Sequence, residues 1–140
     1  MLMRAVISIM RPEQWVKNLI VFAALIFARR FTDTQDVLHS LLAFGILCFL
    51  SSAIYIVNDL HDREQDSLHP TKKSRPLASG ALSPIIARLL AVTLILAGMG
   101  ASFLLPREFL YIVMIFVAFN ILYTALLKTI VIIDVMSIAV

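Results

Sequence analysis

The fold is decided by the stretch "LLAFGILCFLSSAIYIV" at residues 41–57, which has no charged side chain and leads directly into "NDLHDREQD" at residues 58–66. Together with the four residues before it, the apolar run is long enough to cross a lipid bilayer as one helix. The polar stretch then places an amide and three acids at helical spacing. This sequence predicts a membrane helix whose end carries a row of acids.

The composition of the chain excludes an ordinary soluble domain. Of its 140 residues, 61% are hydrophobic and 15% are charged, and the mean hydropathy is +0.94. Soluble domains average about 45–50% apolar and about 25% charged residues. We therefore expect an all-α, polytopic transmembrane helical bundle, because lipid offers no hydrogen-bond partner to an open backbone. Cys48 is the only cysteine, which excludes a disulfide or a cysteine-based metal site within one chain.

Four membrane spans and the start of a fifth follow from the apolar runs. The first is the weakest, because its uncharged core covers only residues 19–28 and the flanking basic side chains must reach outward to the interfaces. The polar segment at residues 58–83, called the motif loop below, separates the second span from the third. We expect spans near residues 15–31, 37–57, 84–105 and 109–127, and an incomplete span at 129–140.

The distribution of basic residues predicts the orientation. With the N-terminus inside, nine of the twelve Lys and Arg residues fall in inside segments, and the outside loops hold only Arg29, Arg30 and Arg107. This bias is the positive-inside pattern of cell-membrane proteins. We expect a multi-pass protein of the inner (cytoplasmic) membrane with a cytoplasmic N-terminus and a cytoplasmic motif loop. The short apolar patch before Arg11 is not that of a cleavable signal peptide.

The acids of the motif loop form a series with a spacing of four. Asn58, Asp62 and Asp66 would lie on one face of a helix, with Asp59 beside them. Oxygen ligands of this kind suit Mg²⁺, which typically bridges one or two carboxylates to substrate phosphates. The bases that follow in "HPTKKSRPLASG" could hold phosphate oxygens. The alternative is a solvated loop surface whose acids and bases neutralise one another.

Three stretches resemble a known family. "NDLHDREQDSLHPTKKSRPLASG" at residues 58–80 resembles the first aspartate-rich motif and loop of the UbiA-type intramembrane prenyltransferases. "RPEQWVKNLIVFAALIF" at residues 11–27 and "YTALLKTIVIIDVMSIA" at residues 123–139 resemble one branch, the decaprenyl-phosphate phosphoribosyltransferases. The resemblance covers nearly the whole chain.

The resemblance implies about nine helices around a cavity that opens to the cytoplasm and laterally to lipid. It implies two aspartate-rich motifs that hold Mg²⁺ and a diphosphate, of which residues 1–140, as the N-terminal half, carry the first. The 140-residue chain alone is then expected to be inactive. The implied catalytic residues are Asp59 and Asp62. The implied metal ligands are Asn58, Asp59, Asp62 and Asp66, and the implied substrate-binding residues include Asn58, Lys72, Lys73 and Arg75.

Several other polar residues are candidates for a site, and two of them have two possible roles each. Lys17 is either an interfacial lysine beside Trp15 or, with Asn18, a contact to a substrate phosphate, which the resemblance favours. Tyr123 is either a packing residue or a substrate contact. The remaining candidates for the cavity are Asp134 and Lys128, and we expect Asp134 to pair with Lys128 or with a basic residue of a later helix. An acid inside a membrane segment is costly unless it is paired or faces water.

The leading hypothesis is a Mg²⁺-dependent transferase that moves 5-phosphoribose from cytoplasmic phosphoribosyl diphosphate to a polyprenyl phosphate in the bilayer. The first alternative is a prenyltransferase that joins a prenyl diphosphate to an aromatic or other small acceptor. The second is a non-catalytic, cation-binding membrane protein or transporter piece. The sequence predicts no nucleic-acid partner and leaves the oligomeric state open.

The orientation can be checked with one engineered thiol. A Ser67→Cys variant in a Cys48→Ser background should resist a membrane-impermeant thiol reagent in intact cells, because the motif loop is predicted to lie inside. The measurement is labelling before and after the cells are opened. Labelling of the intact cells would overturn the orientation.

Overall fold

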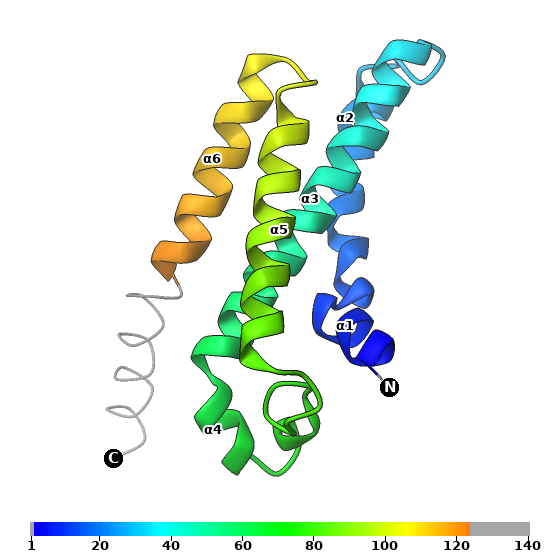
Figure 1. Ribbon diagram of the computed structural model, residues 1–140. Coiled ribbons are helices and arrows are strands. Elements are labelled where there is room, and N and C mark those ends of the chain that lie inside the picture. Colours follow the sequence, from blue (N-terminus) through cyan, green and yellow to red (C-terminus); the bar gives the residue numbers. More distant parts are fainter. Residues whose placement is uncertain (1, 124–140) are drawn as a thin grey trace, which may run out of the picture.

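The structure is a computed structural model that describes residues 2–123, and within this range it contains helices and no strand (Figure 1). The prediction of an all-α membrane bundle is confirmed. The predicted fifth span at 129–140 and the end of the fourth lie outside the described residues. The elements are α1 (Leu2–Met10), η1 (Pro12–Leu19), α2 (Ile20–Phe27), α3 (Thr34–His61), α4 (Arg63–Leu68), η2 (Lys72–Ser74), α5 (Pro84–Ser102) and α6 (Arg107–Leu122).

Helix α3 is the axis of the bundle. It begins where the side chain of Asp33 accepts hydrogen bonds from the backbone N–H groups of Gln35 and Asp36. Its 28 residues span about 42 Å, which is longer than the roughly 30 Å hydrocarbon core of a bilayer. The helix therefore continues past the predicted span of 37–57 and carries Asn58 and Asp59 out of the apolar region.

The first predicted span is not one helix. Its first part is the 3-10 helix η1, and only the eight residues of α2 are α-helical. Arg29, in a left-handed conformation with φ of 55°, follows α2. By contrast, α3 and α5 are each long and apolar enough to cross a membrane. Helix α5 starts at the predicted residue, after the Ser83 side chain accepts a bond from the Ile85 N–H.

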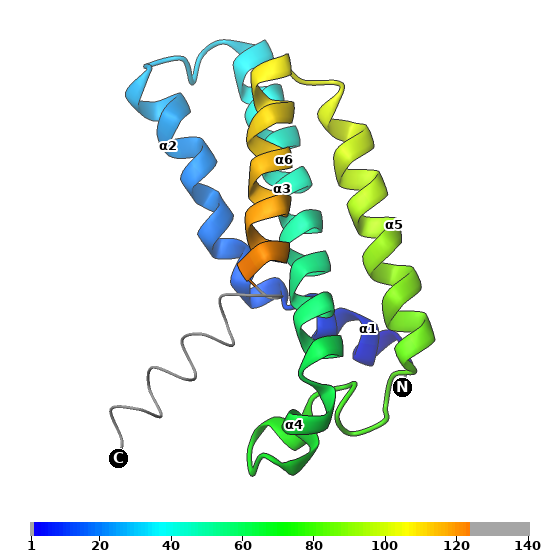
Figure 2. The same cartoon turned by 90° about the vertical axis from the view of Figure 1, so that its left-hand side faces the viewer.

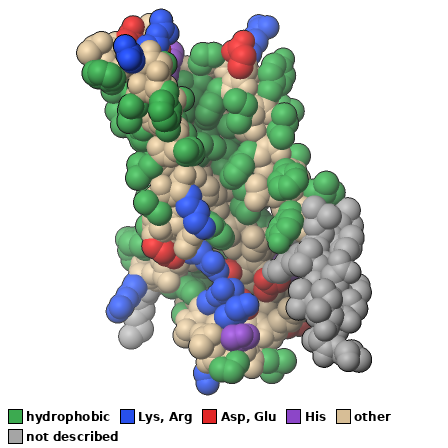
Figure 3. Space-filling model, turned by 180° about the vertical axis from the view of Figure 1, so that it is seen from behind, with side chains coloured by type: hydrophobic (Ala, Val, Ile, Leu, Met, Phe, Trp, Pro, Cys, Tyr) green, Lys and Arg blue, Asp and Glu red, His purple; other side chains and the backbone are tan. Residues whose placement is uncertain are grey.

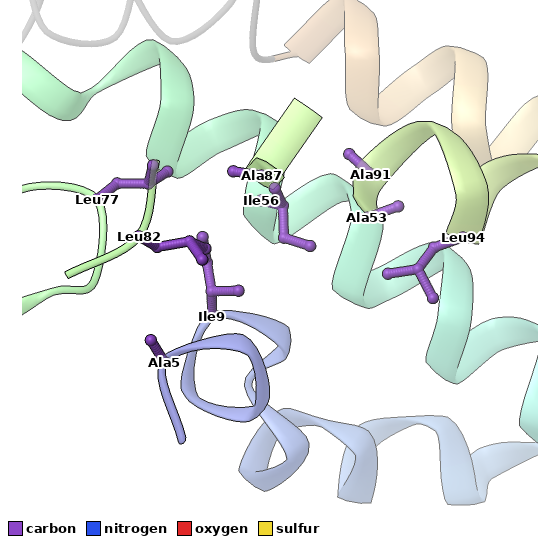
Figure 4. Packing of buried hydrophobic residues seen from close by; sticks show 9 residues of the cluster. All are labelled: Ala5, Ile9, Ala53, Ile56, Leu77, Leu82, Ala87, Ala91 and Leu94. Atoms are coloured by element: carbon purple, nitrogen blue, oxygen red, sulfur yellow. The ribbon is translucent and has the colours of Figure 1, made fainter. Parts of the chain in front are cut away.

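Small residues bring α3 and α5 close together at the end that carries the motif loop. The buried cluster there joins α1, α3, α5 and the motif loop (Figure 4). Alanines from α3 and α5 face one another in this cluster, which lets the two backbones approach. The cluster consists of Ala5, Ile9, Ala53, Ile56, Leu77, Leu82, Ala87, Ala91 and Leu94. It fixes the motif loop against the bundle and so positions the site described below.

The two ends of the bundle carry different segments. Helices α1 and α4 lie at one end, and the α2–α3 and α5–α6 connections lie at the other (Figures 1 and 2). On the face seen in Figure 3, charged side chains gather at the upper end and in the lower half. The basic residues predicted to be outside, Arg29, Arg30 and Arg107, thus share one end. Which end faces the cytoplasm stays a prediction.

The contact between α3 and α5 can be tested at Gly98. A Cβ atom added there would lie 2.9 Å from Cγ and Cδ2 of Leu50, whose side chain is fully buried. Gly98→Ala should therefore lower the free energy of unfolding by about 1–3 kcal/mol through overpacking. The measurement is denaturation of the protein in lipid.

The matched control is Gly100→Ala in the same helix. A Cβ at Gly100 meets nothing within 4 Å, and replacing a helical glycine by alanine stabilises a helix by roughly 0.5–1 kcal/mol. Equal effects of the two substitutions would show that α3 and α5 do not pack at this distance.

Candidate functional site

A cavity of about 270 Å³, whose mainly apolar wall carries several polar side chains, lies between η1, α3 and α6, and we refer to it as the polar cavity. Four of the residues proposed from the sequence, Lys17, Asn18, Asn58 and Tyr123, line it together. The remaining lining residues are Gln14, Ser51, Ile54, Tyr55, Phe116 and Asn120. The structure thus brings together residues that are up to about a hundred positions apart in the sequence.

Helical spacing explains why these side chains meet. On α3, Ser51, Tyr55 and Asn58 are separated by four and three residues, and on α6, Phe116, Asn120 and Tyr123 follow the same rule. Residues at such spacing share one helix face. The faces of α3 and α6 and the side chains of η1 therefore enclose one space.

The lining combines one cation with four carboxamides. Lys17 is the one charged residue among the described lining residues, and the amides belong to Gln14, Asn18, Asn58 and Asn120. Two contacts orient the amides: Asn18 Nδ2 donates to Ser51 Oγ at 3.4 Å, and Asn120 Nδ2 donates to the Phe116 carbonyl at 2.8 Å. Amides both donate and accept hydrogen bonds, and an ammonium group attracts phosphate. The lining can bind a ligand that carries hydroxyl groups and negative charge.

The acids next to this cavity are held by arginines. Asp59 Oδ1 accepts from Arg11 at 2.6 Å and from Arg75 at 3.2 Å, and Asp66 Oδ2 accepts from Arg75 at 2.6 Å. Lys72 Nζ lies 3.9 Å from Asp66 Oδ1. Asp59 and Asp66 are 4% and 3% exposed. Carboxylates this deeply buried require paired charges, and each has them.

Residues 11–18 lie along α3 through a series of polar contacts. The Arg11 guanidinium lies 5.0 Å from the centre of the Tyr55 ring, within the range of a cation–π interaction. Trp15 Nε1 donates to Ser52 Oγ at 2.9 Å, and Ser52 Oγ donates to the Met10 carbonyl at 2.8 Å. Since Tyr55 also lines the polar cavity, Arg11 connects the ion pairs to the cavity wall.

The predicted metal ligands are divided between two environments. Asn58 faces the polar cavity, whereas Asp59 and Asp66 contact Arg75. Asp62 follows the last residue of α3, and its N–H donates to the Asn58 carbonyl at 2.9 Å. Within residues 2–123, no three His, Cys, Asp or Glu side chains come together as a metal-binding group. Asn58 and Asp62 still lie one helical turn apart and offer the oxygen ligands that suit Mg²⁺, so a magnesium site stays a prediction.

Three predicted residues and several unpredicted ones complete the comparison with the sequence. Lys73 is exposed, and Lys128 and Asp134 lie outside the described residues. Sequence reasoning gave Arg11 and Tyr55 no role in a site. It did not consider Gln14 or Asn120. Asn120 could have been found, because a carboxamide within an uncharged membrane run needs a polar neighbour.

A helical bundle with membrane-length helices α3 and α5, and a cavity lined by one cation and four carboxamides beside the acid-ended α3, is the framework of an integral membrane protein. The sequence profile of the UbiA prenyltransferase family matches residues 18–140. The chain belongs to this family.

Curated relatives share long stretches with the chain. A decaprenyl-phosphate phosphoribosyltransferase of Corynebacterium glutamicum is 44% identical over 100 residues, which cover 70% of this chain and 30% of the relative. The enzyme of the same name from Mycobacterium tuberculosis is 32% identical over 131 residues, covering 91% and 43%. An uncharacterized protein of Sinorhizobium fredii is 34% identical over 131 residues, covering 92% and 25%. The chain spans less than half the length of these relatives.

The contacts of residues 11–18 can be tested at Ser52. Ser52→Ala should lower the free energy of unfolding by about 1–3 kcal/mol, because the Trp15 N–H and the Met10 carbonyl lose their partner in a fully buried position. The N–H groups of residues 11–18 should also exchange hydrogen faster. Unfolding and hydrogen exchange in lipid measure both effects.

The adjacent Ser51 supplies the control. Its contacts with Asn18 are 3.4 Å long, so Ser51→Ala should cost clearly less. If the two alanine variants were equally stable and exchanged alike, residues 11–18 would not be held to α3 through Ser52.

Proposed function

We propose that this protein contributes the donor site of a Mg²⁺-dependent membrane transferase that moves 5-phosphoribose from phosphoribosyl diphosphate to a polyprenyl phosphate of the decaprenyl type. The observation that carries the proposal is the lining of the polar cavity, with Lys17 among four carboxamides. The activity for which the relatives from Corynebacterium glutamicum and Mycobacterium tuberculosis are named supports the same choice.

The donor has two kinds of groups for this lining to recognise. Its ribose hydroxyls donate and accept hydrogen bonds, as carboxamides do. Its phosphates are anions, and Lys17 provides a positive charge that attracts them. The described lining contains no carboxylate that would neutralise the charge of Lys17.

In the proposed reaction, polar side chains at the end of α3 hold the metal ion that assists the leaving group. The bond from C1 of the ribose to the diphosphate breaks with its electron pair on the diphosphate, and a phosphate oxygen of the polyprenyl phosphate bonds to C1. Mg²⁺ bound with the diphosphate supplies positive charge for that leaving group. Asn58 and Asp62 lie one helical turn apart at the end of α3 and carry the oxygen ligands that would hold it.

The apolar part of the same lining suits the lipid acceptor. Ile54, Phe116 and Tyr123 could contact the first isoprene units while the phosphate of the acceptor approaches Lys17. The aromatic rings would equally suit a prenyl diphosphate and an aromatic acceptor, so a prenyltransferase is the second candidate. The choice of donor distinguishes the two.

The donor assay uses Lys17→Met in lipid, with the remaining family helices present in the same chain or as a second chain. Loss of a charge-assisted contact worth about 1.5–3 kcal/mol should raise KM for phosphoribosyl diphosphate about 10- to 100-fold. Arg107→Met is the control, because Arg107 is exposed, begins α6 and does not line the polar cavity. Removing Mg²⁺ with a chelator should stop turnover.

Two results would contradict the proposal. Turnover with a prenyl diphosphate and an aromatic acceptor, and none with phosphoribosyl diphosphate, would select the prenyltransferase. Equal KM values for the Lys17→Met and Arg107→Met variants would remove Lys17 from the donor site.

A further inference from the structure

A hollow of about 520 Å³ lies where the end of α3 and the starts of α4 and α5 meet, at the motif-loop end of the bundle (Figure 1). Its lining residues are Leu60, His61, Arg63, Glu64, Pro84 and Arg88. None of them lines the polar cavity or takes part in the ion pairs of Asp59 and Asp66. The proposed function therefore leaves this hollow without a role.

The hollow is basic. Arg63, Arg88 and His61 face one carboxylate, that of Glu64. Among residues 2–123, no carboxylate oxygen lies within 4.0 Å of either arginine's nitrogens. Arg63 Nε donates to the Leu77 carbonyl at 3.3 Å, which holds its side chain while both terminal nitrogens stay available. The arginines at Asp59, in contrast, are already neutralised.

An aliphatic stripe begins beside this basic group. Arg88 directly precedes the uncharged part of α5. Ile85, Leu89, Val92 and Leu96 follow one another by three or four residues and are 65%, 64%, 54% and 66% exposed. They share one face of the helix, close to the face that carries Arg88. A charged head above an apolar stripe is the arrangement of a basic residue at the membrane interface.

We propose that this hollow binds the phosphate of an anionic phospholipid, whose acyl chains lie along the exposed stripe of α5. One guanidinium group can donate two parallel hydrogen bonds to two oxygens of a phosphate, whereas an ammonium group lacks this planar geometry. The stripe selects a lipid over free phosphate, because only a lipid covers exposed aliphatic side chains while its phosphate contacts Arg63 and Arg88. The proposal does not depend on the transferred group or on the donor.

The test compares lipids retained by the chain. The protein is placed in nanodiscs of phosphatidylcholine with a minority of phosphatidylglycerol, and bound lipids are counted by native mass spectrometry. The wild type should retain phosphatidylglycerol in preference to phosphatidylcholine. In a double variant, Arg63→Gln with Arg88→Gln, the ratio of retained phosphatidylglycerol to phosphatidylcholine should fall at least about fivefold. A fall of this size is expected when basic residues near an anionic membrane surface lose their charge.

Two controls make the result specific. Arg107→Gln removes an exposed arginine at the other end of the bundle and should leave the preference unchanged. Arg88→Gln alone is a milder change, because Arg88 is exposed and has no ion-pair partner among residues 2–123, and it should give a smaller loss in the same direction.

Three outcomes would overturn the proposal. The preference could be unchanged in both variants of the hollow. It could fall equally in Arg107→Gln, which would indicate general electrostatic attraction. Inorganic phosphate could bind the wild type in nanodiscs of pure phosphatidylcholine and be lost in the double variant without any preference for phosphatidylglycerol, which would indicate a site for free anions.

Discussion

The carboxylate of Asp59 is the point to which two distant parts of the chain are tied. It is buried at the end of α3 and contacts Arg11 from the N-terminal residues and Arg75 from the motif loop. A buried carboxylate without cations would be strongly destabilising. The burial of Asp59 therefore depends on its ion pairs with the two arginines. Arg75 extends the contact to Asp66. One helix end thereby holds both flanking segments.

The position of the polar cavity follows from this arrangement. Arg11 directly precedes η1, and η1 supplies Lys17 and Asn18 to the cavity wall. Release of Arg11 would remove one of the contacts that hold this segment, leaving the bond from Trp15 to Ser52. The adjacent residues Asn58 and Asp59 thus differ in what they do. Asn58 faces the cavity, and Asp59 holds the segments that complete it.

The sequence predicted the larger features and missed the pairing of charges. Uncharged runs were sufficient to locate α3 and the start of α5, because lipid requires each run to be helical. Spacing was sufficient to put Asn58 and Asp62 one turn apart. It could not reveal the contact between Asp59 and Arg11, since these residues are 48 positions apart. The sequence also could not show that η1 is a 3-10 helix, because the polar contacts that accompany η1 join it to residues of α3 that are distant in the sequence.

A double-mutant cycle on Arg11 and Asp59 tests the central claim most directly. The free energy of unfolding is measured in lipid for the wild type, Arg11→Gln, Asp59→Asn and the double variant. The account predicts a coupling energy of about 1.5–3 kcal/mol, because the buried carboxylate and the guanidinium stabilise each other. Additivity of the two substitutions within about 0.5 kcal/mol would show that Asp59 does not hold the N-terminal residues, and would contradict the account.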